Sequence, residues 1–186
     1  MIYFTSDLHF GHDKLFLYGP RGFTNIQEHD ETIIKNWNSI VTPNDIVYVL
    51  GDLMLNDNEH GVECINKLNG HLKVILGNHD TIERTSIYEG EQLKNVEVLG
   101  YAVPLRYKKF NFFLSHYPTI TNNYDSDKLY KIVTNLCGHT HTNNRFADAD
   151  KGMIYHCELD AHNNKPVSIE EVIDECRELV ISLRKA

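Results

Sequence analysis

The chain has 186 residues, of which 41% are hydrophobic, and it carries a formal net charge of -8 at pH 7. This composition predicts a single domain over residues 1–186, and the absence of any run of Lys or Arg argues against binding of long duplex nucleic acid. No apolar stretch is long enough for a signal peptide or a membrane span, and the four cysteines lack C-x-x-C spacing. We therefore expect a cytoplasmic protein with reduced cysteines and no membrane partner.

Strand-like and helix-like segments alternate along the first half of the chain, which is typical of an α/β or mixed-sheet domain. Strands are predicted over 2–4, 45–52 and 71–80. Thr24 and Gln27 suggest a capping box at the start of a helix that follows the first strand. A second helix, with Val62 and Leu68 on its apolar side, is expected to end before Gly70.

The second half of the chain is predicted to add further strands and a C-terminal helix. Apolar segments over 97–106, 110–116, 133–138 and 153–159 indicate strands. The last helix is expected to begin at Ser168, because Glu171 follows three residues later and completes a capping box.

Residues of metal-ligand type stand where each strong predicted strand ends. They are Asp7 and His9, Asp52, Asn78 and His79, His116, and His139 and His141. Any one of them could be an ordinary turn or surface residue. Because ligands of open sheets bind beyond the carboxyl ends of the strands, we expect the whole set to share one crevice.

The donor atoms of this set indicate which chemistry it can support. Carboxylate, amide and imidazole ligands without a thiolate suit borderline divalent ions such as Mn²⁺, Fe²⁺, Zn²⁺ or Co²⁺. Seven ligands exceed the need of one ion. Two ions about 3.5 to 4 Å apart, joined by a bridging carboxylate, would acidify a water and stabilise in-line displacement at phosphorus.

The motifs "DLH", "GD", "GNHD", "LSHYP" and "GHTH", in that order, resemble those of the calcineurin-like metallophosphoesterase superfamily. The stretches "SDLHFGH" and "DAHNNKPVSIEEV" are similar to its small bacterial and phage members of largely unassigned substrate. The resemblance implies an α/β fold in which two mixed sheets flanked by helices form a four-layer αββα sandwich. It also implies a dinuclear metal centre at one edge, with two Mn²⁺ ions or, alternatively, Fe²⁺, Zn²⁺, Ni²⁺ or Co²⁺.

The resemblance further implies a role for each motif residue. The ligands of the first ion would be Asp7, His9 and His141, the bridge would be Asp52, and the ligands of the second ion would be Asn78, His116 and His139. His79 would remain outside the metal shell as a general acid. Asp80 is a candidate for orienting His79, with Asn56 and Asp57 as alternatives. Leu55 occupies a position where protein phosphatases carry Asp, which argues against that branch.

The family pattern leaves His12 and Arg21 without a role. Both are candidates for contacting phosphate oxygens of a substrate, because Arg suits bidentate phosphate recognition and both lie in loops beside the predicted site. The alternatives are that Arg21 pairs with a surface acid and that His12 caps a turn.

Together these features predict a metal-dependent phosphoesterase acting on a small phosphoester, above all a nucleotide-like phosphodiester. A nuclease of the same superfamily acting on DNA or RNA is one alternative, and a non-catalytic metal-binding scaffold is another. The sequence leaves the oligomeric state open.

Overall fold

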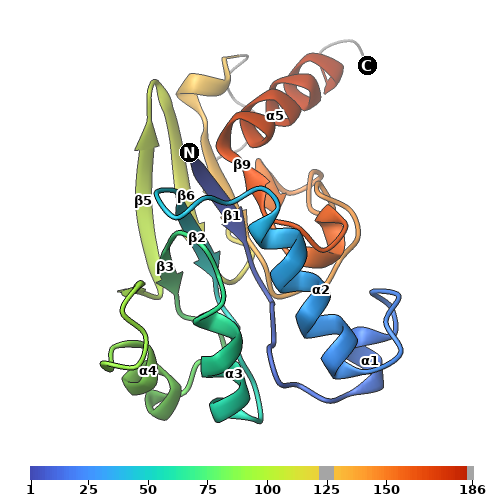
Figure 1. The fold of residues 1–186 in the computed structure, drawn as a ribbon. Helices are drawn as coiled ribbons and strands as arrows, with labels where there is room; N and C mark the ends of the chain where they lie inside the picture. Colours follow the sequence, from blue (N-terminus) through green and yellow to red (C-terminus); the bar gives the residue numbers. More distant parts are fainter. Residues whose placement is uncertain (122–127, 184–186) are drawn as a thin grey trace.

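Two mixed β-sheets that pack face to face form the centre of the protein in the computed structural model, which describes residues 1–121 and 128–183 (Figure 1). This arrangement confirms the predicted α/β class of two mixed sheets with flanking helices. The five-stranded sheet contains, in spatial order, β4 (Val96–Gly100), β3 (His71–Ile75), β2 (Ile46–Leu50), β1 (Ile2–Thr5) and β9 (Val167–Ser168). The four-stranded sheet contains β5 (Ala102–Tyr107), β6 (Phe110–Ser115), β7 (Val133–Cys137) and β8 (Ile154–His156).

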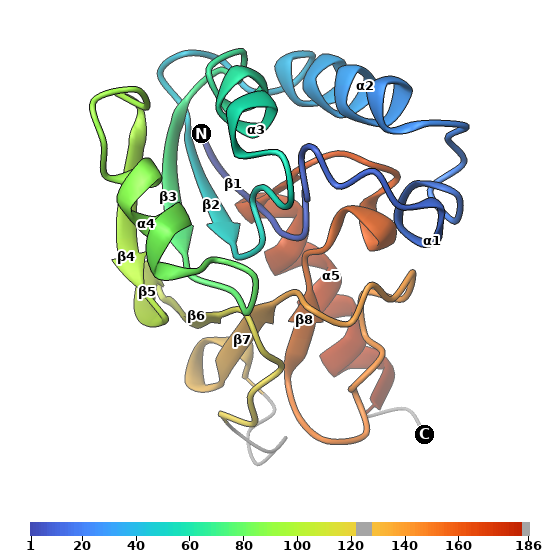
Figure 2. The same ribbon diagram turned by 90° about the horizontal axis from the view of Figure 1, so that it is seen from below.

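The strand directions bring several loops to the same edge of the molecule. Strands β1 to β4 are parallel and only β9 runs antiparallel to β1, while β6, β7 and β8 are parallel and β5 is antiparallel. Ile46 pairs with both Ile2 and His71, so β1, β2 and β3 start level with one another. Parallel strands in register end at one edge, and the loops that follow them emerge there (Figure 2).

Successive side chains of the central strands point to opposite faces of the sheet, which divides the core into two layers. Tyr48 and Leu50 of β2 face the four-stranded sheet, whereas Val47 and Val49 face the helices. The helices on this second face are α2 (Ile26–Asn38), α3 (Asn58–Ile65) and α4 (Ile82–Tyr88) (Figure 2). Trp37 of α2 is fully buried there, and its indole N–H donates to the carbonyl of Asn69.

The remaining short elements and the C-terminal helix complete the fold. These are α1 (Leu15–Tyr18), η1 (Leu129–Lys131), η2 (Leu159–His162) and α5 (Ile169–Leu183). Helix α5 adds Val172, Ile173 and Cys176 to the core that the two sheets share. The four cysteines are free and buried. In the described residues, no helix has the length and apolarity that crossing a membrane would require.

The helix starts show one confirmed capping box and one that is displaced. Ser168 and Glu171 form the predicted box at α5, because Ser168 donates to the Glu171 carboxylate and accepts from the Glu171 N–H. At α2 the prediction is wrong by one residue. Asn25 caps the helix by accepting from the N–H of Glu28, whose carboxylate accepts from the N–H and hydroxyl of Thr24. Asn is the stronger N-cap residue, which explains the displacement.

Two predicted boundaries also differ from the structure. The single strand predicted over 97–106 is two strands in different sheets, because β4 ends at Gly100, whose φ of +95° turns the chain before β5. Helix α3 ends at Ile65, before Leu68, and a turn leads from there to Gly70. An apolar pattern continues through both places, so it does not reveal where the chain changes direction.

Candidate metal centre

The seven predicted metal ligands lie together at the edge where the parallel strands end. Asp7 and His9 follow β1, Asp52 follows β2, and Asn78 follows β3. His116 follows β6, and His139 and His141 follow β7, so the second sheet supplies the other three. Both sheets are therefore needed to assemble the set.

Five of these residues have a left-handed backbone. The φ angles are 56° at Asp7, 51° at His9, 56° at Asp52, 77° at His139 and 49° at His141. For residues other than glycine this conformation costs about 1 to 2 kcal/mol each. Such strain is found at functional sites, where the surrounding structure holds the chain against it.

Asp7, His9 and His141 form the first group. Asp7 Oδ1 lies 3.6 Å from the Nε2 atoms of both histidines, which are themselves 3.2 Å apart. Asp7 Oδ2 accepts from the Ser6 hydroxyl at 2.6 Å and from the His139 N–H at 2.8 Å. Within the described residues, the buried Oδ1 has no hydrogen-bond partner. A buried, unpartnered carboxylate oxygen that faces two imidazoles fits a divalent cation.

Asn78, His116 and His139 form the second group. Asn78 Oδ1 lies 2.8 Å from His116 Nε2 and 2.9 Å from His139 Nδ1. His116 Nδ1 lies 2.8 Å from the carbonyl oxygen of Leu50, to which it can only donate. In the neutral ring, Nε2 then carries a lone pair that faces the amide oxygen. Two acceptors in this arrangement fit a shared cation, and the bond to Leu50 fixes the required tautomer.

Asp52 lies between the two groups. Its Oδ2 atom is 3.7 Å from His9 Nε2 and 3.6 Å from His116 Nε2. Burial raises the pKa of Asp52 to about 6, and the negative charge of Asp7 contributes to the rise. Burial also lowers the pKa of His9 to about 4, which keeps its imidazole neutral, as a metal ligand must be. The site thus concentrates negative charge that a cation would offset.

The glycines of the "GD" and "GHTH" motifs are required by close approach. Gly51 has a φ of +97°, and a Cβ atom there would overlap the His116 ring and the backbone of Gly77. A Cβ atom at Gly138 would overlap the side chains of Ser6 and Asp7. Both glycines allow the ligand-bearing loops to touch one another.

Asp80 does not occupy the position expected of a partner for the His79 imidazole. Its buried Oδ2 accepts from the backbone N–H groups of Asp52 at 2.9 Å and Gly77 at 2.8 Å, and its Oδ1 accepts from the Tyr88 hydroxyl at 2.7 Å. The carboxylate therefore joins the loops after β2 and β3. In the part of the chain that the structure describes, no carboxylate hydrogen-bonds to the His79 ring.

Arg21 pairs with an acid, as in the alternative to phosphate contact, although the side chain of that acid, Asp160, is only 12% exposed. The Arg21 side chain is 0% exposed, and the guanidinium donates twice to Asp160, at 3.1 and 2.7 Å, and once to the backbone oxygen of Asp7 at 2.8 Å. Asp160 Oδ2 is 3.2 Å from His141 Nδ1. Although burial opposes ionisation, His141 and Arg21 hold the pKa of Asp160 below its usual range. Arg21 thus positions Asp160, and Asp160 orients His141.

Sequence reasoning assigned no role to Asp160. It is the first residue of the "DAHNN" stretch in η2, and no local pattern relates it to His141, 19 residues earlier. The sequence signal for Asp160 is the resemblance of the "DAHNN" stretch to small members of the superfamily.

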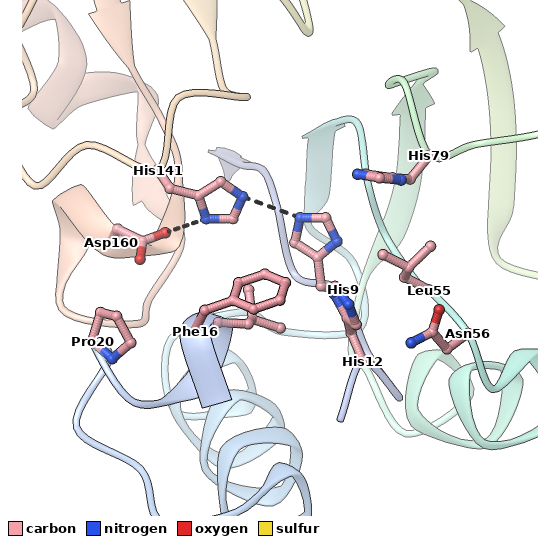
Figure 3. A pocket seen from close by; sticks show the side chains of 10 residues that line it. His9, His12, Phe16, Pro20, Leu55, Asn56, His79, His141 and Asp160 are labelled. Carbon is pink, nitrogen blue, oxygen red and sulfur yellow. Dashed lines mark hydrogen bonds and ion pairs between the residues drawn. The ribbon is translucent and has the colours of Figure 1, made fainter. Parts of the chain in front are cut away.

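A cavity of about 610 Å³ opens beside the first group of ligands (Figure 3). Four histidines line it, namely His9, His12, His79 and His141. Its other walls are Phe16, Leu17, Pro20, Leu55, Asn56 and Asp160. The ring centroid of the half-buried His79 is 5.6 Å from that of His9. The ring centroid of His12 is 5.7 Å from that of His9. Both predicted residues thus face a ligand-sized space, as Figure 3 shows.

Comparison with known proteins gives a consistent result. The model of the calcineurin-like phosphoesterase family matches residues 1–149. An uncharacterized protein of Methanocaldococcus jannaschii is 34% identical over 180 residues, covering 92% of this chain and 89% of its own. The Gene 66 protein of Mycobacterium phage D29 is 28% identical, with 96% and 95% covered. A solved protein of unknown function from Aquifex aeolicus shares the fold, with a TM-score of 0.68, 23% identity, and 94% and 98% of the two chains covered.

Proposed function

Because the chain belongs to the calcineurin-like phosphoesterase family, we propose that it is a dinuclear metal-dependent hydrolase of small, nucleotide-like phosphodiesters. One observation carries the dinuclear part of this proposal. The Asp52 carboxylate lies 3.6 to 3.7 Å from one histidine of each ligand group, a geometry that supports a bridging role. The family uses divalent metals, and the mixture of oxygen and imidazole donors suits Mn²⁺.

The ligands divide between two ions in this proposal. Asp7, His9 and His141 would hold one ion, Asn78, His116 and His139 would hold the other, and Asp52 would be shared by both. When bound, the two ions supply a water of lowered pKa and neutralise charge on the phosphoryl oxygens. The bond from His116 to Leu50, and that from His141 to Asp160, keep the two rings in the orientation that coordination requires.

The cavity residues act on the substrate. His79 donates a proton to the departing oxygen, because it faces the cavity and belongs to neither ligand group. His12 contacts phosphate or another polar group of the substrate from the neighbouring wall. Burial lowers the pKa of His12, so its ring is neutral near pH 7 and can either donate or accept a hydrogen bond.

The shape of the cavity supports a small substrate with an apolar part. Its volume of about 610 Å³ lies in the range of small-molecule sites. Phe16, 72% exposed at the cavity, offers an aromatic face to a nucleobase. The net charge of -8 opposes long polyanions, which disfavours the nuclease alternative. A non-catalytic metal-binding scaffold would need the ligand geometry but not His79 facing the cavity.

A substrate panel with Mn²⁺-loaded protein tests this proposal. The panel contains cyclic nucleotides, dinucleotides, nucleotide monoesters, bis-p-nitrophenyl phosphate, single-stranded DNA and plasmid DNA. We expect hydrolysis of small diesters, loss of activity after chelation, and two Mn²⁺ per chain by elemental analysis. Asp52→Asn should abolish activity and reduce the Mn²⁺ content, whereas His71→Ala, at an exposed position, should change neither.

Three outcomes would contradict the proposal. Binding of fewer than two Mn²⁺ ions would exclude a dinuclear centre, and preferential cutting of plasmid DNA would favour the nuclease. Absence of hydrolysis across the panel, with both ions bound, would favour the scaffold.

A further inference from the structure

A second convergence of metal-ligand atoms lies outside the candidate metal centre, between helices α2 and α3. His60 and Cys64 are four residues apart on α3 and therefore share one face of that helix. Asp30 of α2 faces them. The ligand atoms of the three side chains all lie within 4.8 Å of one another. Asp30 and Cys64 are buried, and the His60 side chain is 36% exposed.

A single hydrogen bond does not account for both close contacts of the His60 ring. His60 Nε2 is 2.9 Å from Asp30 Oδ2 and 3.4 Å from Cys64 Sγ. A ring nitrogen carries either one proton or one lone pair, so it can bond well to only one of them. Around a tetrahedral Zn²⁺ ion, neighbouring N, O and S ligands are separated by about 3.3 to 3.6 Å. The cluster therefore needs only small movements to surround such an ion.

Hydrogen bonds behind the cluster hold Asp30 in place. Asp30 Oδ2 accepts from the N–H of Gly11 at 3.0 Å, and Oδ1 lies 2.7 Å from His29 Nδ1. His29 Nε2 in turn lies 3.0 Å from Arg21 Nη1. Partners of this kind orient a metal-bound carboxylate and are a regular part of metal sites. They also connect the cluster to the loop that carries His9 and to Arg21.

A cavity of about 470 Å³ leads to the cluster. Asp13, Glu31 and Asp57 line it together with the three ligand residues. The carboxylates attract a cation into the cavity, and the cavity has room for a water as a fourth ligand.

We propose that Asp30, His60 and Cys64 bind one Zn²⁺ ion, separate from the candidate metal centre. The thiolate distinguishes this site from the other, whose donors are oxygen and nitrogen only, and it selects Zn²⁺ over Mn²⁺. The role is structural: the ion joins α2 to α3 and, through Gly11, holds the loop between β1 and α1.

Cobalt substitution tests the proposal, because a thiolate bound to Co²⁺ gives a ligand-to-metal charge-transfer band in the near ultraviolet that oxygen and nitrogen ligands do not give. The whole chain is stripped with a chelator and titrated with Co²⁺. We expect this band to reach the intensity of one thiolate-bound Co²⁺ per chain by about three equivalents, because the candidate metal centre takes up the other two ions. The band should be absent in Cys64→Ser and retained in Cys176→Ser, a matched control at another buried cysteine. Asp52→Asn should also retain it, since that residue belongs to the other centre.

Elemental analysis after Zn²⁺ loading gives a second readout. Cys64→Ser should hold one ion fewer per chain than Cys176→Ser. His60→Ala, at a partly exposed position where misfolding is not expected, should also lose that ion, which covers the case in which Cys64→Ser fails to fold. A protein without the thiolate band, a band that persists in Cys64→Ser, or equal zinc content in His60→Ala and the wild type would overturn the proposal.

Discussion

Replacing Tyr88 by Phe tests whether Asp80 supports the loops of the candidate metal centre. Tyr88 is fully buried, and its hydroxyl donates to Asp80 Oδ1 at 2.7 Å. Hydrogen bonds to charged groups contribute about 1.5 to 3 kcal/mol, and Tyr88→Phe leaves that oxygen buried without this donor. We expect a loss of about 2 kcal/mol in the free energy of unfolding, or a fall in Tm of about 4 to 8 °C for a chain of this length.

Urea denaturation in the presence of a chelator measures this loss, because bound metal would add its own stabilisation. Tyr101→Phe is the matched control, since Tyr101 is 73% exposed and its substitution should change stability by less than about 0.5 kcal/mol. A Tyr88→Phe variant as stable as this control would refute the reasoning.

Activity separates the two roles considered for Asp80. If Asp80 holds the loops of Asp52 and Gly77, Tyr88→Phe should weaken metal affinity. At limiting metal it should then lower the hydrolysis rate of all substrates by the same factor. If Asp80 orients the general acid, the variant should instead slow esters with basic leaving groups more than p-nitrophenyl esters at saturating metal. The second pattern would restore the role predicted from the sequence.

Three other variants give sharp expectations. His79→Ala should retain its metals and slow esters with basic leaving groups by about 10²- to 10⁴-fold but p-nitrophenyl esters much less, and equal losses would exclude a general acid. Arg21→Lys, which cannot hold Asp160 in a bidentate pair, should lower metal affinity by about 10- to 100-fold with KM unchanged at saturating metal, and a raised KM would indicate contact with substrate. Burial lowers the pKa of His162 to about 4, so its unfolded form binds a proton first as the pH falls. Between pH 7 and 4.5 the free energy of unfolding of the wild type should therefore fall by about 2 kcal/mol more than that of His162→Gln. The same dependence of the unfolding free energy on pH in both proteins would contradict this.

The edge of the sheet at which the ligands meet follows from local sequence. Residues such as Asp7 and Asp52 stand directly after apolar strands, and the rule that parallel strands end at one edge places their loops together. The pairing of β6 with β7 then brings His116 and His139 to the same region. The motif residues follow these apolar strands closely in sequence, so this part of the site was predictable.

The supporting contacts were not predictable in the same way, because they join residues far apart in the chain. Arg21 and Asp160 are separated by 139 positions, and neither lies in a repeating pattern. Asp80 follows His79 directly, which suggested a partnership, yet its side chain points to the loop backbones instead. The contact of His60 with Asp30 is of the same kind, because only tertiary packing brings α2 against α3.

The left-handed backbone at five ligand positions has a consequence for descendants of this chain that lose their chemistry. Glycine adopts that conformation without penalty, and Asn tolerates it better than most residues. If these residues bind metal as proposed, His and Asp must remain at these positions at the expense of folding stability. Once selection relaxes, replacement of His141 by Gly would stabilise the fold, because its side chain is 37% exposed and its loss leaves no buried cavity. Inactive descendants should therefore gain thermal stability as they lose this ligand, and a glycine in place of His141 would record the loss.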